Sequence, residues 1–129
     1  MIAAGIDLVH IPRIRGLLER YGERFLARVF TPREVAGRRR AAHELAARFA
    51  AKEAVAKALG VGVRVLAGDG IGFHEVETVP DARGKPLVIL SGRAADRARE
   101  LGLTDWSISL SHEREYAVAQ VVAQGPGGR

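Results

Sequence analysis

The sequence predicts an α+β fold in which a small antiparallel sheet packs against a long central helix. Strand-like segments occur at the start of the chain and as two closely spaced pairs later in it. A helix-forming run occupies the middle of the chain, from about residue 42 to residue 59. The resulting order of strand, helices, hairpin, helix and hairpin favours antiparallel pairing of neighbouring strands.

The first third of the chain predicts one strand followed by helices. Residues 2–9 alternate along a strand, with Ile2, Ala4, Ile6 and Leu8 on one face and Ala3, Gly5, Asp7 and Val9 on the other. Asp7 is therefore an acid in an otherwise apolar strand. Pro12 suits the first turn of a helix over residues 11–21. The run Thr31-Pro32-Arg33-Glu34 is typical of a helix start with a capping box, which predicts a short helix before the long one.

The rest of the chain predicts two hairpins separated by a helix. Glycines punctuate residues 61–72, which favours a loop. The expected elements are strands over residues 73–79 and 86–90, a helix over 92–101, and strands over 106–110 and 116–122 around a turn at 111–114. By length, residues 1–124 form a single domain, and residues 125–129 are expected to be a flexible tail.

Composition narrows the classes of function. The chain has 129 residues, of which 47% are hydrophobic and 27% charged, as in globular domains. Cysteine is absent, which excludes disulfides, thiolate nucleophiles and cysteine-ligated zinc. No leader-like start or long apolar stretch is present, so we expect a cytoplasmic protein with no membrane partner.

The net charge of +5 is carried entirely by the first 48 residues. They contain ten arginines and five acids, and the arginines are Arg13, Arg15, Arg20, Arg24, Arg28, Arg33, Arg38, Arg39, Arg40 and Arg48. Such a surface attracts a polyanion or an acidic protein. It is also compatible with a solvated surface that serves solubility, or with a nucleic-acid-binding module. The scattered aromatic residues form no stacking strip, which weakens the nucleic-acid alternative.

The long helix carries charges where an amphipathic helix would be apolar. Lys52 lies in the middle of a face formed by Leu45, Phe49, Ala56 and Leu59, and Glu53 lies at its edge. One interpretation is that Lys52 extends its ammonium to water while Glu53 and Lys57 form a surface ion pair. The other is that these charges belong to a functional site.

Two carboxylates support the second interpretation. Asp7 and Glu53 are hard oxygen donors of the kind that Mg²⁺ uses when substrate phosphates complete its coordination shell. Neighbouring lysines would hold further phosphate oxygens. His112, in the predicted turn after Ser111, could donate a hydrogen bond to a phosphate or a base, although a lone turn histidine is often without function.

Three blocks of the sequence resemble a known family. They are Gly5-Ile6-Asp7-Leu8, the run from Arg48 to Gly60 that contains Lys52-Glu53-Ala54, and Ser107-Ile108-Ser109-Leu110-Ser111-His112. Together they resemble the bacterial holo-acyl-carrier-protein synthases, which are short 4'-phosphopantetheinyl transferases. The resemblance implies that fold, and transfer of 4'-phosphopantetheine from coenzyme A to a serine of apo-acyl carrier protein, with release of adenosine 3',5'-bisphosphate. It does not extend securely to residues 61–72 or to the tail.

The resemblance also implies roles for individual residues. Asp7 and Glu53 are expected to ligate Mg²⁺, and Lys52, Lys57, Ser111 and His112 to bind coenzyme A. Glu53 and Lys57 are the expected catalytic residues, with Glu53 a ligand first and a proton acceptor second, directly or through water. The carrier protein is expected to contact Arg13, Arg20, Arg24 and Arg28.

The family further implies a homotrimer with sites at subunit interfaces, and no nucleic-acid partner. A non-catalytic subunit that binds coenzyme A or a carrier protein is a third interpretation, and the presence of both acids argues against it. The preferred carrier protein, the use of acyl-coenzyme A and the preference for Mg²⁺ over Mn²⁺ stay open.

Overall fold

A computed structural model describes residues 1–37, 40–63 and 70–126 of the chain. The first half contains β1 (Ile2–His10), α1 (Ile11–Tyr21), α2 (Glu23–Val29) and α3 (Ala42–Ala58). The second half contains the 3₁₀ helix η1 (Phe73–Glu75), β2 (Val76–Pro80), β3 (Pro86–Leu90), α4 (Gly92–Leu101), β4 (Asp105–His112) and β5 (Tyr116–Gln124). In this part of the chain no helix is long and apolar enough to cross a membrane.

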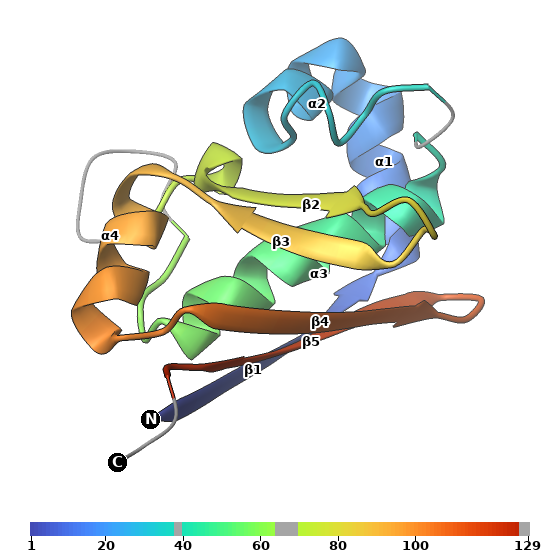
Figure 1. The fold of residues 1–129 in the computed structure, drawn as a ribbon. Coiled ribbons are helices and arrows are strands. Elements are labelled where there is room, and N and C mark those ends of the chain that lie inside the picture. The colour runs from blue at the N-terminus through green and yellow to red at the C-terminus, as the bar shows by residue number, and fades with distance from the viewer. Residues whose placement is uncertain (38–39, 64–69, 127–129) are drawn as a thin grey trace.

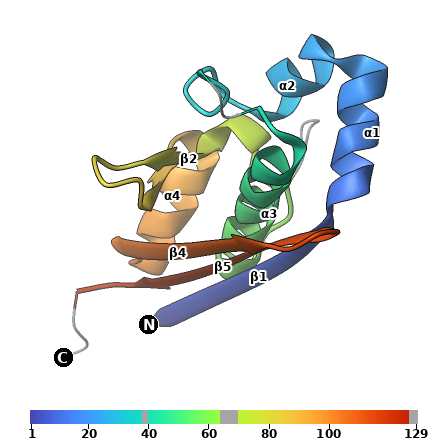
Figure 2. The same ribbon diagram turned by 90° about the vertical axis from the view of Figure 1, so that its right-hand side faces the viewer.

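Two antiparallel sheets surround the long helix α3. One sheet has three strands in the order β1-β5-β4, so β1 and β4 are its edges, and the other is the β2-β3 hairpin. Figures 1 and 2 show α3 lying between the three-stranded sheet and the hairpin, with α1 and α2 beyond its N-terminal half. The predicted α+β class and the central helix are confirmed, although the strands form two small sheets.

Helix α3 is buried on nearly every side because small side chains let its neighbours approach closely. Its buried residues include Leu45, Phe49 and Val55 together with seven alanines. The closest approach is at Gly5 of β1, where an added Cβ would lie 1.9 Å from the carbonyl oxygen of Ala54. Only glycine permits this contact between β1 and α3.

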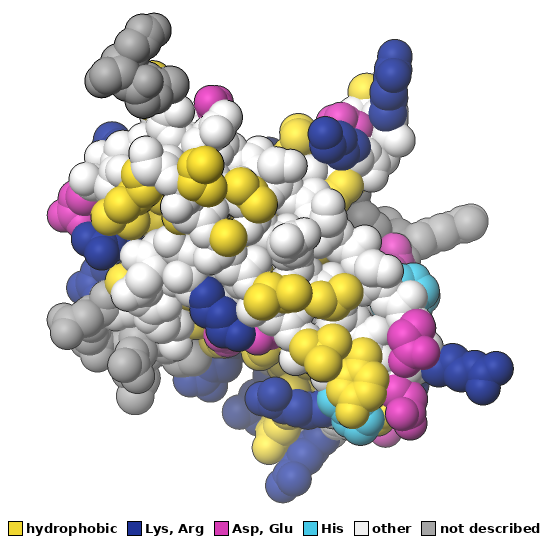
Figure 3. Space-filling model, turned by 90° about the horizontal axis from the view of Figure 1, so that it is seen from below, with side chains coloured by type: hydrophobic (Ala, Val, Ile, Leu, Met, Phe, Trp, Pro, Cys, Tyr) yellow, Lys and Arg dark blue, Asp and Glu magenta, His cyan; other side chains and the backbone are white. Residues whose placement is uncertain are grey.

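The two faces of the three-stranded sheet differ in what covers them. The inner face packs on α3 through residues such as Val9, Ile108 and Val121, all of which are buried. No described segment covers the outer face, where exposed apolar side chains lie beside polar ones such as Ser109 and Gln120. Its exposed side chains include Ile2, Ile6, Leu8, Tyr116 and Val122. Figure 3, which views the molecule from below, shows yellow side chains spread over this face.

One helix prediction is wrong, and one helix was missed. Thr31–Glu34 forms a turn and starts no helix, although the backbone N–H of Thr31 donates to Glu34 Oε1 at 3.0 Å as in a capping box. The Glu34 carboxylate is instead held in the core by Lys52 and by the backbone N–H of Thr78. Helix α2 was not predicted because it has only seven residues and no side-chain cap.

Most other boundaries agree closely with the prediction. Helices α1 and α4 and strand β3 have the predicted bounds, and β4 and β5 are slightly longer than predicted. The predicted strand over residues 73–79 begins with the turn η1. Part of the predicted glycine loop, residues 64–69, and the end of the expected tail, residues 127–129, lie outside the described residues.

Candidate active site

Asp7 is positioned by strand β1, on the face that packs against α3. It pairs in register with Ala119 of β5, and its side chain is only 17% exposed. The close approach at Gly5, two residues earlier on the same face, brings this end of β1 against α3. Asp7 is therefore a partly buried acid at an edge strand, accessible from one side.

Glu53 reaches the same place from α3. It is half-buried, whereas Lys52 and Ala54 beside it are fully buried. Burial raises the pKa of the Glu53 carboxyl, and the negative charge of nearby Asp7 raises this pKa further. Two carboxylates held close enough to repel each other form a pair that a cation would stabilise.

Lys57 and Arg13 supply positive charge to this acid pair. Lys57 Nζ donates to Asp7 Oδ1 at 3.0 Å and to the carbonyl oxygen of Ile6 at 2.9 Å. Thus Lys57 pairs with Asp7 rather than forming the surface pair with Glu53 that the first interpretation required. The charges of Lys57 and Arg13 partly oppose the rise in the pKa of Glu53. Arg13 also lies over the ring of Phe49, with its Cζ 5.9 Å from the ring centroid.

The acid pair fits Mg²⁺ chemically. Both donors are carboxylate oxygens, and the pKa of Glu53 is raised first by burial and then by the negative charge of Asp7, which a bound cation would offset. Among the described residues no group of three or more His, Cys, Asp or Glu side chains could hold a metal. A magnesium ion here would therefore depend on water and substrate phosphates for the rest of its ligands, as is usual for Mg²⁺ in phosphoryl transfer.

Lys52 does not lie with the other predicted phosphate contacts. Its side chain is fully buried, and its ammonium donates to Glu34 Oε1 at 2.7 Å and to the carbonyl oxygens of Phe73 and Val76 at 2.9 and 2.5 Å. Burial lowers the pKa of Lys52, and the charge of Glu34 opposes this change. The expectation that Lys52 contacts phosphate is corrected, because its ammonium is turned into the core, and the expectation that it extends to water is corrected for the same reason.

Ser111 and His112 lie at the far edge of the sheet, on β4 rather than in a turn. They align with Val118 and Ala117 of β5. Because successive strand residues face opposite sides, the Ser111 side chain belongs to the outer face and His112 to the inner one. The His112 ring lies against that of His43, with centroids 4.5 Å apart. A single chain therefore does not bring these residues together with Asp7 and Glu53.

A pocket of about 370 Å³ opens beside the two histidine rings. It is lined by Ile11, Arg15, His43, His112, Glu113 and Arg114. Sequence reasoning missed His43, since a histidine in the first turn of a helix carries no distinctive pattern. It also missed Glu34, whose capping-box position concealed its role as the buried partner of Lys52.

The arginines predicted to bind a carrier protein fall into two groups. Arg13 lies near the acid pair, whereas Arg24 and Arg28 border a pocket of about 320 Å³ between α1 and α2. Leu17, Tyr21 and Phe25 complete the lining of that pocket. Arg20 lies beside this pocket, over the ring of Tyr21, with its Cζ 5.4 Å from the ring centroid. The result is an apolar hollow framed by positive charge.

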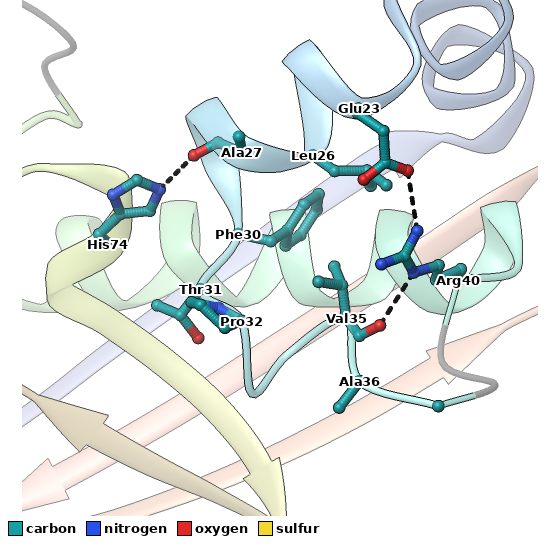
Figure 4. Close-up of a pocket in the computed structure, with 11 residues that line it drawn as sticks. Glu23, Leu26, Ala27, Phe30, Thr31, Pro32, Val35, Ala36, Arg40 and His74 are labelled. Carbon is teal, nitrogen blue, oxygen red and sulfur yellow. Dashed lines mark hydrogen bonds and ion pairs between the residues drawn. The ribbon is translucent and has the colours of Figure 1, made fainter.

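Another pocket, of about 520 Å³, contains none of the predicted site residues (Figure 4). Phe30 and Leu26 point into it from the end of α2. At its rim Arg40 donates to Glu23 and to the carbonyl oxygen of Val35, at 2.8 and 3.0 Å. Neither Asp7 nor Glu53 lines this pocket, so it is separate from the acid pair.

Comparison with known proteins finds relatives that match nearly the whole chain. The family profile described as the 4'-phosphopantetheinyl transferase superfamily matches residues 3–121. The holo-[acyl-carrier-protein] synthase of Gloeobacter violaceus is 50% identical over 125 residues, which cover 94% of this chain and 91% of that protein. The synthase of Herpetosiphon aurantiacus is 46% identical over 127 residues, covering 97% of this chain and all of its own.

Solved structures similar to this one belong to the same family of synthases. The holo-[acyl-carrier-protein] synthase of Helicobacter pylori, crystallised in complex with coenzyme A, superposes with a TM-score of 0.80 at 32% identity and covers 96% of this chain and 100% of its own. The synthase of Neisseria meningitidis superposes with a TM-score of 0.80 at 37% identity, covering 96% of this chain and 99% of its own.

The fold and the acid pair together define a small α+β domain of the phosphopantetheinyl-transferase type, in which a buried helix presents a carboxylate to an edge strand. The chain belongs to the holo-[acyl-carrier-protein] synthase family of the 4'-phosphopantetheinyl transferase superfamily.

Proposed function

We propose that this protein is a Mg²⁺-dependent transferase that moves 4'-phosphopantetheine from coenzyme A to a serine of apo-acyl carrier protein. The observation that carries the proposal is the convergence of Asp7 and Glu53, from a strand and a helix far apart in sequence, on one partly exposed place. Family membership favours this reaction over the nucleic-acid-binding alternative. The magnesium requirement is an inference from the chemistry of the acid pair.

In the proposed reaction the carrier serine oxygen attacks the phosphorus that bears pantetheine. The new P–O bond joins pantetheine phosphate to the serine, and the broken pyrophosphate bond releases adenosine 3',5'-bisphosphate. Asp7 and Glu53 would hold Mg²⁺, which when bound offsets charge on the pyrophosphate. Lys57, which pairs with Asp7 in this structure, would turn to a phosphate oxygen, and Arg13 would add to the positive field.

The serine proton needs an acceptor, and Glu53 is the residue we propose. Burial and the charge of Asp7 raise its pKa, which makes it a better base than an ordinary surface glutamate. A bound cation would oppose this effect, so the ligand role comes first. Transfer by direct displacement also needs no protein nucleophile, in agreement with the absence of cysteine.

We propose that the complete site forms between subunits of a homotrimer. Asp7 lies on one edge strand, whereas Ser111 lies on the other edge strand and on the opposite face of the sheet. The exposed apolar side chains of the outer face supply a surface for self-association. Ser111, which shares that outer face, would then lie at the contact between two chains.

Replacing Leu8 with glutamate tests the assembly. Leu8 is 61% exposed on the outer face, so Leu8→Glu should leave the fold of a single chain intact but place a charge in the subunit interface. We expect light scattering to give three times the chain mass for the wild type and the monomer mass for the variant. Leu87→Glu, at an exposed leucine of the other sheet, is the matched control. A wild-type monomer with full transfer activity would contradict the proposal.

We propose that the apolar hollow between α1 and α2 receives a helix of the acidic carrier protein. Its floor of Leu17, Tyr21 and Phe25 offers apolar contact, and Arg20, Arg24 and Arg28 surround it with positive charge. Arg13 would extend the positive surface toward the acid pair, where the carrier serine must arrive.

Charge reversal at Arg24 tests the docking surface. We expect Arg24→Glu to raise the KM for the carrier protein about tenfold, equivalent to about 1.4 kcal/mol, while the KM for coenzyme A stays constant. The difference should shrink in high salt, which screens exposed charges. Arg99→Glu on α4 is the matched control, since Arg99 is also exposed but lies away from the hollow. An unchanged KM for the carrier would remove Arg24 from the surface.

The metal requirement is tested by product release. Coenzyme A and an apo-carrier protein are incubated with the protein that has been treated with EDTA, and nucleotides are separated by chromatography. We expect adenosine 3',5'-bisphosphate to appear only after Mg²⁺ is restored. Equal release with EDTA present would contradict a metal-dependent reaction, whatever the carrier used.

A further inference from the structure

The pair formed by Lys52 and Glu34 is a buried charged contact that the proposed reaction does not use. Both side chains are 0% exposed, and Lys52 Nζ has three acceptors, which is all that an ammonium can use. The Glu34 carboxylate accepts from Lys52 and also from the backbone N–H groups of Thr31 and Thr78, at 3.0 and 2.9 Å. The charges are thus fully hydrogen-bonded inside the core.

This network joins α3 to three other segments. Glu34 belongs to the turn after α2, Phe73 to η1, and Val76 and Thr78 to β2. Buried ion pairs are weak sources of stability, because apolar residues of similar volume often serve as well. Their hydrogen bonds are directional, however, and so restrict how the joined segments are oriented.

Outside this network the buried contacts of helix α3 are mostly apolar, and the long side chain of Lys57, which donates to Asp7 and Ile6 of β1, can follow a small rotation of the helix. Its buried surface is dominated by alanines, which interlock less than larger side chains. A rotation of about 20° would move a carboxylate about 6 Å from the helix axis by about 2 Å. Metal–ligand distances lie within only about 0.2 Å of their usual values. A misplacement of about 1 Å at a reacting group can lower the rate about a hundredfold.

Lys52 and Glu53 are adjacent residues that point to different sides of α3. Lys52 faces η1 and β2, whereas Glu53, about 100° further round the helix, faces Asp7 on β1. Fixing the direction of one therefore fixes the direction of the other. We propose that Lys52 and Glu34 are positioning residues that set the rotation of α3 and so hold Glu53 beside Asp7. This inference rests on the proposed function, which it deepens.

The test replaces the pair with apolar residues. Removing one partner would leave a buried charge and threaten folding, whereas Lys52→Met with Glu34→Leu removes both charges. The backbone N–H of Thr78 and the carbonyl oxygen of Val76 lose their partners, so we expect a lower thermal midpoint with a cooperative transition retained. Mg²⁺ affinity is measured by calorimetry with coenzyme A present and no carrier protein, so that nothing turns over. We expect the double variant to bind Mg²⁺ about tenfold more weakly and to lose kcat, with the KM for coenzyme A within about twofold.

Two further variants complete the design. Arg99→Met with Asp96→Leu removes an exposed pair on α4 in the same way and should change neither Mg²⁺ affinity nor kcat. Glu34→Gln keeps the side-chain shape but weakens the pair, and we expect a smaller change in the same direction. If the double variant does not fold, the Mg²⁺ affinity and kcat of Glu34→Gln test the inference instead.

Either of two results would overturn the inference. A folded variant with wild-type Mg²⁺ affinity and kcat would show that the pair only contributes stability. A raised KM for coenzyme A with unchanged Mg²⁺ affinity would instead make Lys52 a phosphate contact. If the wild type itself showed no turnover, the proposed function would fail. This result is distinct from a failure of the inference, because it is seen before any variant is compared.

Discussion

Glu53→Gln should abolish transfer while making the protein more stable at neutral pH. Loss of a metal ligand removes several kcal/mol of transition-state stabilisation, which corresponds to about a thousandfold or more in kcat. The same residue is costly to the fold, because burial and Asp7 make ionisation of Glu53 unfavourable. A residue that lowers stability while serving the reaction is typical of an active site.

The pH dependence of this stability effect follows from the sign of the pKa change. The pKa of Glu53 is raised in the folded state, so the folded protein holds the proton more tightly than the unfolded chain. The favourable contribution is present below the unfolded pKa and is lost as the pH rises through the folded pKa. Glutamine has no such loss. We therefore expect the thermal midpoint of Glu53→Gln to exceed that of the wild type near pH 7.5, with the gap closing in acid.

The measurement is a series of thermal unfolding curves between acidic and neutral pH, with transfer activity assayed on the same samples. Glu19→Gln, at an exposed position of α1, is the matched control and should alter neither quantity. A Glu53→Gln variant that is less stable than the wild type at neutral pH would contradict the claim that ionised Glu53 destabilises the fold. Retained activity would contradict its catalytic role.

Gly5→Ala should destabilise the fold and remove most activity. The new Cβ would lie 1.9 Å from the carbonyl oxygen of Ala54 and 3.0 Å from the backbone nitrogen of Ala58, so β1 and α3 must separate. Overpacking against backbone costs about 3 kcal/mol, which lowers the thermal midpoint of a chain of this size by roughly 10 °C. Separation also moves Asp7 away from Glu53, so surviving folded protein should bind Mg²⁺ weakly.

Gly16→Ala provides the matched control for the same chemical change. Gly16 lies within α1, and a Cβ there would meet nothing within 4 Å. Alanine is the better helix former by up to about 1 kcal/mol, so this variant should be slightly more stable than the wild type. If differential scanning calorimetry gave the two variants equal midpoints, the close approach of β1 and α3 would not matter to the fold.

The sequence predicted the fold well where a local pattern specifies an element. Helix α1 with Pro12 and helix α4 before Gly102 have strong boundary signals, and both were predicted with the observed bounds. Thr31–Glu34 was predicted wrongly because its capping-box pattern is local, whereas the partner of Glu34 lies 18 residues further along the chain. The placement of a buried charge depends on tertiary contacts that no local pattern encodes.

The site was predicted in the same uneven way. Asp7 stood out as an acid in an apolar strand, and it does lie beside Glu53. Lys52 stood out for the same reason on α3, but its environment is a core ion pair rather than the acid pair. The arginine-rich start indicated a basic surface, whereas the hollow between α1 and α2 became visible only once α2 was known.

The central claim is that this protein uses the acid pair of Asp7 and Glu53 to transfer phosphopantetheine to a carrier protein. Intact-mass spectrometry of the carrier tests this claim most directly. Apo-acyl carrier protein is incubated with coenzyme A, Mg²⁺ and either the wild type or Glu53→Ala. We predict that the carrier gains one phosphopantetheine with the wild type and none with the variant. It should also gain none when its acceptor serine is replaced by alanine. No mass gain on any of several apo-carriers, or an equal gain with Glu53→Ala, would contradict the account.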